Sequence, residues 1–148
     1  MKSFMVRLIA ISGIAAVAFF AGLSTGRAQA PMMGWGPAVI HVSQMMDADF
    51  PPPAVPGAAR VKVVGRLDTG VVQIQMGATK KHYHTNSNEA QYILKGSGMF
   101  WLGDKQVAVG PGDLIVIPKG TNHGMDSDYE AIAFKSPPQA PDDIHQVP

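Results

Sequence analysis

Seven short apolar runs follow one another between residues 61 and 135, and they are separated by Gly, Pro or Asp. Their sequences are VKVVG, GVVQIQMG, AQYILKG, GMFWLG, KQVAVG, DLIVIP and EAIAFK. Runs of this length, closely spaced and broken by turn residues, predict antiparallel strands that close into a sandwich or a barrel. No segment after Arg60 shows the period of an amphipathic helix. The sequence therefore predicts an all-β domain.

The first thirty residues differ from the rest of the chain. Lys2 and Arg7 precede the apolar run LIAISGIAAVAFFAGL, and the small residues Ala28 and Ala30 follow it in STGRAQA. A charged start, an apolar middle and an A-x-A site predict a signal peptide over residues 1–30. A retained membrane anchor is the alternative, but the run of 16 residues is shorter than the ~20 that usually span a bilayer. We therefore expect a periplasmic or secreted chain with no stable membrane anchor.

Composition limits the partners and the site chemistry. The 148 residues suit one compact domain with its own hydrophobic core. The chain has no cysteine, so any metal site must use His, carboxylate or amide groups. Residues 1–30 contain three basic residues and no acidic one, so their removal changes the formal charge from +1 to −2. This charge balance gives no indication of a nucleic-acid partner.

Two segments flank the predicted domain of residues 61–136. Residues 31–60 are rich in Pro, Met and Gly, which predicts an extended arm, or a mere linker. Within this arm, VIHVSQMM is a candidate edge strand or a strand swapped between subunits, and His41 is expected to be structural. Residues 137–148 are expected to form a flexible tail or a surface strap, with His145 solvated. The arm and the open sheet edges predict a homodimer.

The stretch KKHYHTNSNEAQYILKG brings together three side chains that can bind a metal. His82 and His84 are alternate residues of a strand, so their rings share a face. TNSN is a turn-forming sequence, and we expect a hairpin there that returns Glu89 beside the two histidines. The alternative is that the two rings lie solvated on an edge strand and that Glu89 is a surface charge.

A second stretch, GPGDLIVIPKGTNH, adds a third histidine. A buried strand is predicted to end at Pro118, and Gly120 allows a tight reversal. His123 then lies at the mouth of the next segment. Alone, such a histidine is more often a capping or surface residue than a metal ligand.

Together, the two stretches resemble the paired motifs of the cupin superfamily, G(X)5HXH(X)3-4E(X)6G and G(X)5PXG(X)2H(X)3N. The first motif is matched from Gly77 to Gly96, except that four residues and not five separate Gly77 from His82. The second is matched from Gly112 to His123, and Ser127 stands where the motif has Asn. The resemblance covers roughly residues 61–135 and leaves the Pro-rich arm unexplained.

This resemblance implies a small β-barrel or jelly roll, the cupin double-stranded β-helix, in which one divalent metal is bound. Its ligands would be His82, His84, Glu89 and His123. Three imidazoles and one carboxylate suit Fe, Mn, Ni, Cu or Zn. Four protein ligands on an octahedral ion would leave two positions for water, substrate or dioxygen. Alternation along the strand also turns Gln91 inward, where it is the best polar candidate to orient a ligand or substrate.

Three classes of function are compatible with such a site. The first is a dioxygenase- or lyase-like enzyme that converts a small organic acid or phenolic in a largely apolar pocket. The lyase version needs a general base near the metal, but alternation turns Tyr83 and Tyr92 outward, and Tyr129 has no predicted place. The second class is a non-catalytic periplasmic protein that binds or senses a metal or small ligand. The third is a structural module stiffened by its metal.

Overall fold

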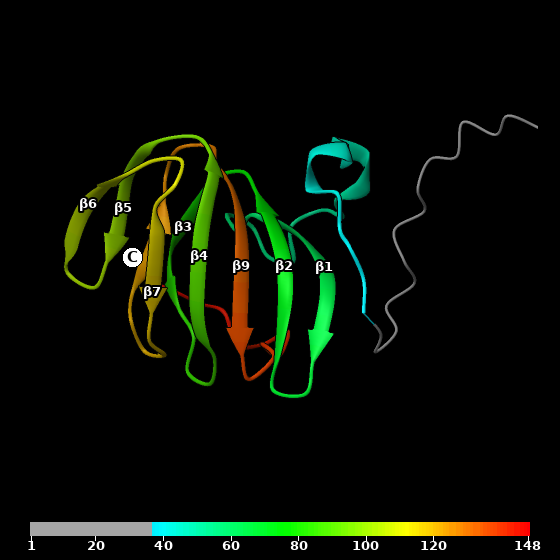
Figure 1. The fold of residues 1–148 in the computed structure, drawn as a ribbon. Coiled ribbons are helices and arrows are strands. Elements are labelled where there is room, and N and C mark those ends of the chain that lie inside the picture. The colour runs from blue at the N-terminus through cyan, green and yellow to red at the C-terminus, as the bar shows by residue number, and fades with distance from the viewer. Residues whose placement is uncertain (1–36) are drawn as a thin grey trace, which may run out of the picture.

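A computed structural model describes residues 37–148 as two five-stranded antiparallel sheets that face each other (Figure 1). The first sheet has the strand order β1-β2-β9-β4-β7 and the second has the order β10-β3-β8-β5-β6. The strands of the first sheet are β1 (Arg60–Leu67), β2 (Gly70–Met76), β9 (Glu130–Ser136), β4 (Asn88–Lys95) and β7 (Leu114–Ile117). Those of the second are β10 (His145–Gln146), β3 (Thr79–Tyr83), β8 (His123–Met125), β5 (Gly98–Leu102) and β6 (Lys105–Val109). Each of the seven apolar runs contributes a strand, so the all-β prediction is confirmed.

One predicted local connection is wrong. The turn sequence TNSN was expected to close a hairpin between the strand of the histidines and the strand of Glu89. In the structure β3 and β4 belong to different sheets, and the segment between them carries the chain from one sheet to the other. Glu89 therefore meets the histidines across the space between the sheets and not along a shared ladder.

The interior between the sheets has an apolar part and a polar part. Inward residues of five strands and a neighbouring loop form the apolar core: Ile93, Phe100, Ile115, Ile117, Met125, Tyr129 and Ala131. The alternation predicted for β4 is present, because Glu89 and Gln91 are each 2% exposed whereas Tyr92 is 43% exposed. The polar part of the interior begins where these two inward side chains replace apolar ones.

Two glycines of the sequence motifs are required by the backbone. Gly96 has φ +83°, and a Cβ there would lie 2.4 Å from the carbonyl oxygen of Asp128. Gly120 has φ +79°, and its N–H donates to the carbonyl of His84 at 2.7 Å. Both conformations lie in the left-handed region that favours glycine. The hydrogen bond from Gly120 to His84 also ties the turn of the second motif to the first motif.

The two segments outside the barrel contain short regular elements, 3-10 helices in the arm and a strand in the tail. The predicted signal peptide, residues 1–30, and the start of the arm lie outside the described residues. In VIHVSQMM the structure has a short 3-10 helix, Val42–Gln44, in place of the candidate strand, and a second one follows at Asp47–Asp49. In the tail, β10 pairs with β3, so this segment is a strap held against the barrel. No helix among residues 37–148 is long and apolar enough to cross a membrane.

Candidate metal centre

Two pairs of directly opposed residues place the site between the sheets. On β3 and β8, His82 lies opposite His123, and on β4 and β9, Glu89 lies opposite Lys135. Opposed residues of neighbouring strands point to the same face of their sheet. Each of the four is at most 7% exposed, and His84, which follows β3, is 2% exposed. The two sheets thus direct five polar side chains into one buried space.

The metal-ligating atoms of the three histidines converge. One nitrogen of each of His82, His84 and His123 lies within 4.8 Å of the others, so these side chains form a buried cluster that could hold a divalent metal. The Nε2 atoms of His84 and His123 are each 3.3 Å from Oε2 of Glu89. Ligands that bind one ion at about 2.0–2.2 Å lie roughly 3–3.5 Å from each other. The structure therefore brings together all four side chains that the sequence motifs indicated.

Main-chain carbonyls fix the orientation of two of the rings. The Nδ1 atom of His82 is 2.8 Å from the carbonyl oxygen of Lys80, and that of His123 is 2.9 Å from the carbonyl oxygen of Thr121. A carbonyl oxygen only accepts, so Nδ1 carries the hydrogen in both rings. In this tautomer the Nε2 atom of each ring turns its lone pair toward the cluster. Hydrogen bonds of this kind support most metal-binding histidines.

The C-terminal tail orients the third ring. Nδ1 of His84 donates to the main-chain carbonyl of Asp143, and Asp143 is 2% exposed. The carboxylate of Asp143 accepts from the N–H and the hydroxyl of Thr85, at 2.7 and 2.6 Å, and from the N–H of Asn86. Burial acts to raise the pKa of Asp143, but these hydrogen bonds outweigh it and lower the pKa to about 2. Sequence reasoning missed this contact.

Two glutamines hold the carboxylate of Glu89. The amides of Gln75 and Gln91 donate to Oε1 at 2.8 and 3.0 Å, which leaves Oε2 directed at the cluster. Gln91, which was predicted to orient a ligand or substrate, thus contacts Glu89 itself. Burial acts to raise the pKa of Glu89, but the charge of Lys135 holds it well below its usual range. The residue is therefore a carboxylate at neutral pH.

Two atoms of the cluster lack a hydrogen bond among the described residues. They are Oε2 of Glu89 and Nε2 of His123, 3.3 Å apart. In the tautomer of His123 that has its hydrogen on Nδ1, Nε2 has no hydrogen to donate to Oε2, and two lone pairs face each other. An unsatisfied buried group costs about 1–3 kcal/mol. A cation between them would satisfy both atoms, so the donor set fits a bound metal.

The neutral state of His82 predicts a pH dependence of stability in the metal-free protein. Burial and the neighbouring His123 lower the pKa of His82 to about 3. The unfolded chain binds this proton near pH 6.5 and the folded chain does not, so stability falls as the pH decreases from about 6.5 toward 3. Uptake of one proton on unfolding changes the free energy of unfolding by at most about 1.4 kcal/mol per pH unit.

Urea unfolding in a chelator at pH 7 and pH 5 measures this slope. His82→Gln is the control, and its free energy of unfolding should depend less on pH over that interval. Equal slopes for the two proteins would contradict the burial of a neutral ring.

Lys135 is a site residue that sequence reasoning missed. It is 4% exposed, and its Nζ lies 3.0 Å from Nε2 of His84 and 3.2 Å from Oε2 of Glu89. The sequence contained a signal for this position, because Ala131, Ala133 and Lys135 alternate in EAIAFK and share the inward face.

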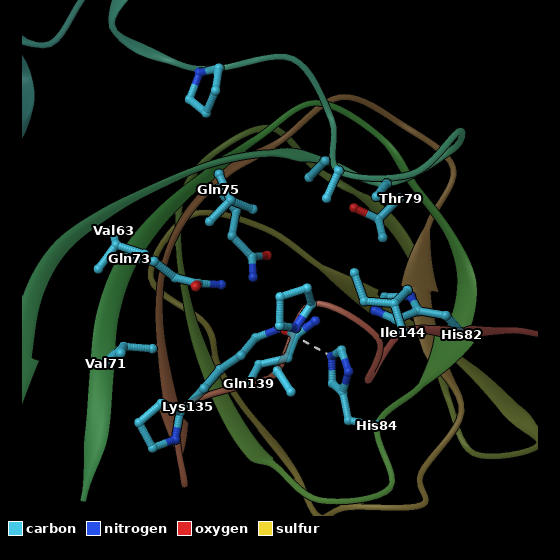
Figure 2. Close-up of a pocket in the computed structure, with 18 of the residues that line it drawn as sticks. Val63, Val71, Gln73, Gln75, Thr79, His82, His84, Lys135, Gln139 and Ile144 are labelled. Atoms are coloured by element: carbon cyan, nitrogen blue, oxygen red, sulfur yellow. Dashed lines mark hydrogen bonds between the residues drawn. The ribbon is translucent and has the colours of Figure 1, made fainter.

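A cavity of about 320 Å³ opens beside the cluster. Figure 2 shows Gln73 and Gln75 on one wall, and Thr79 and His82 on the opposite wall. Lys135 and His84 lie together below them, joined by a hydrogen bond. Apolar side chains and prolines complete the wall: Val61, Val63, Val71, Ile144, Pro51, Pro52, Pro138 and Pro141. The pocket therefore combines an apolar lining with a few amide groups, as small-molecule sites usually do.

Comparison with known proteins supports the resemblance that the two motifs indicated. Residues 70–134 match the model of the Cupin domain, a segment that contains both groups of predicted metal ligands. No curated protein matches the sequence.

Solved structures share the fold at low identity. One is a variant of Streptomyces PAC13 with uridine, which has 21% sequence identity and a TM-score of 0.56 to this chain. The match covers 64% of this chain and 82% of the PAC13 chain. A second structure, described as Pac13, a unique nucleoside dehydratase, gives 22% identity, a TM-score of 0.51 and coverages of 62% and 79%. A double-stranded β-helix protein of Klebsiella pneumoniae gives 16% identity, a TM-score of 0.51 and coverages of 68% and 94%. These similarities concern the fold alone.

Proposed function

We propose that this chain is an exported cupin whose residues His82, His84, Glu89 and His123 bind one divalent transition metal, among Fe, Mn, Ni, Cu and Zn, beside a small-molecule cavity. Its substrate would be a small organic acid or phenolic, converted in a dioxygenase- or lyase-like reaction. The observation that carries this proposal is the pair of facing acceptors, Oε2 of Glu89 and Nε2 of His123, which have no hydrogen bond and are complementary to a cation.

The chain's own residues would position the ligand. A bound metal would supply Lewis acidity or activate a small molecule at its open positions. The amides of Gln73 and Gln75 border the cavity and can bond hydroxyl or carboxyl oxygens of a substrate. Gln75 and Gln91 keep one oxygen of Glu89 occupied, so the other stays available to the ion.

A lyase-like reaction lacks a tyrosine base. Tyr92 is 43% exposed on the outer face, and the ring of Tyr83 stacks on His145, outside the cluster. Tyr129 is buried and its hydroxyl donates to Oε1 of Gln75 at 3.1 Å. Burial raises the pKa of Tyr129, so its hydroxyl is a poor proton acceptor at neutral pH. This favours metal-centred activation, or the alternative of a non-catalytic protein that binds or senses a metal or small ligand.

Analysis of the exported chain tests the proposal. Protein purified from the periplasmic or culture fraction is expected to begin at Pro31 and to contain about one transition metal ion per chain by elemental analysis. Oxygen uptake and turnover of small organic acids and phenolics then separate the enzyme from the binder. A chain that retains residues 1–30 would contradict export as a processed protein, and a chain that takes up no transition metal would contradict the site.

We further propose that the protein is a homodimer that pairs through the outer face of β4, β7 and β9. Tyr92, Leu114, Val116 and Phe134 point outward there and are 43%, 65%, 64% and 36% exposed. They are close neighbours, because Tyr92 lies opposite Leu114 while Ala90 lies between Val116 and Phe134. A contiguous apolar patch of this kind is typical of an interaction surface. A two-fold axis would let the same patch cover itself in a second copy.

Val116→Glu is expected to convert the dimer to a monomer, because it places a carboxylate within this apolar patch. Sedimentation velocity at micromolar concentration measures the change. Leu67→Glu is the matched control, since Leu67 is 53% exposed on β1, at the opposite edge of the sheet from β7. A Val116→Glu protein that sediments as the wild type does would rule out this face as the interface.

A further inference from the structure

We infer that Lys135 binds the anionic group of the cavity's ligand, and that metal binding releases Lys135 for this role. The inference rests on the proposed metal site and narrows its ligand to a small organic anion, such as a carboxylate. It follows from the number of hydrogen-bond donors and acceptors around one buried ammonium group.

Lys135 makes two hydrogen bonds and one ion pair in the structure. Its Nζ lies 3.0 Å from Nε2 of His84 and 3.2 Å from Oε2 of Glu89, and it also donates to Oε1 of Gln139. An ammonium has three donors and no acceptor. In this state the buried ammonium has two hydrogen-bond acceptors and one carboxylate as its ion-pair partner, and two of these three groups belong to predicted metal ligands.

Metal binding removes one of these partners. Nδ1 of His84 donates to the carbonyl of Asp143, so Nε2 has a single lone pair. This lone pair cannot bind a metal ion and accept from Lys135 at the same time. Burial then requires a replacement, because a donor of a charged group left without an acceptor is costly.

The replacement has to come with the ligand. Among the described residues, the cavity is lined by two basic side chains, Arg66 and Lys135, and by no Asp or Glu. A divalent ion, Lys135 and Glu89 sum to a net charge of +2, and a buried excess of charge is unfavourable unless it is compensated. A ligand with one or two negative charges would compensate it and would supply the missing acceptor. Lys135 and the metal would thus select an anion over a neutral molecule of the same shape.

The test uses the exported chain loaded with Co(II), and acetate and acetamide as probes of the same shape. Visible absorption and calorimetry follow their binding. Acetate is expected to bind the wild type, and Lys135→Met should weaken acetate binding at least about tenfold, as expected for the loss of a charge-assisted bond. Lys135→Arg should keep most of the acetate affinity. Acetamide should bind weakly and equally to all three proteins.

Metal affinity provides the second readout. Co(II) should bind Lys135→Met at least as tightly as the wild type, because Lys135 no longer competes for Nε2 of His84. Lys105→Met, in the exposed part of β6, should behave as the wild type in every titration. If Lys135→Met does not fold, Lys135→Gln removes the same charge and places a polar amide beside Glu89.

The outcomes separate this inference from the proposed function. Acetate binding that is unchanged in Lys135→Met, or absent in the Co(II)-loaded wild type, would overturn the role of Lys135 and leave the metal site standing. A loss of Co(II) affinity in Lys135→Met would instead make Lys135 a structural support of the ligands, which also overturns the inference. A wild type that binds no Co(II) would overturn both proposals.

Discussion

Replacement of His84 by alanine is expected to lower the affinity for a divalent metal by more than about a hundredfold. Loss of a residue that merely supports a ligand costs about 10–100-fold, and removal of the ligand itself should cost more. His84 is central to the cluster, because its Nε2 lies 3.3 Å from Oε2 of Glu89 and its ring is held by the carbonyl of Asp143. Competition with a chromophoric chelator, with Co(II) or Zn(II), measures the change.

The control for this substitution is His41→Ala. His41 is exposed in the arm and lies outside the cluster, so its replacement should leave metal affinity unchanged. Thermal unfolding of the metal-free proteins separates loss of a ligand from loss of the fold. A folded His84→Ala protein that keeps wild-type metal affinity would refute the assignment of the ligands.

The strands were predictable because their pattern is local. A run such as DLIVIP marks a buried strand by its own composition and by the proline that ends it. Strands β3, β8 and β10 have no such run. The first two use inward positions for polar ligands, His82 and His123, so hydrophobicity does not mark them. Motif spacing, and not apolar periodicity, indicated those two segments.

Sheet membership was not predictable from the turn signal. TNSN marks a change of direction, but turn residues do not determine whether the next strand pairs with the previous one or joins the opposite sheet. The sheet that the next strand joins depends on which other strands are available to pair with it, and here β4 pairs with β7 and β9. The convergence of Glu89 with the histidines is thus a property of the whole barrel.

The two missed site residues differ in the signal they left. Lys135 alternates with two buried alanines, so the inward position of its side chain could have been read from EAIAFK. Asp143 left no such signal. Its contact with His84 joins positions 59 residues apart, and a segment rich in proline and polar residues gives no periodic pattern. The tail is held by hydrogen bonds to the loop of Thr85 and Asn86 and by the pairing of β10 with β3, and only the assembled fold brings these partners within reach.

Replacement of Asp143 by alanine is expected to lower the free energy of unfolding by about 2–4 kcal/mol, and to weaken metal binding about 10–100-fold. The carboxylate of Asp143 is buried and accepts from the N–H groups of Thr85 and Asn86, which would be left without their acceptor. Loss of these bonds also removes a restraint on the main chain at residue 143, whose carbonyl orients the ring of His84.

Urea unfolding in a chelator and Co(II) titration measure the two effects of Asp143→Ala separately. Asp142→Ala is the matched control, because Asp142 is the neighbouring carboxylate but is exposed. Its stability and metal affinity should equal those of the wild type. A truncation after Pro141 should weaken metal binding at least as much as Asp143→Ala, because it removes the carbonyl as well as the carboxylate. Wild-type metal affinity in the truncated chain would show that His84 keeps its orientation without the tail, and the tail would then contribute to stability alone.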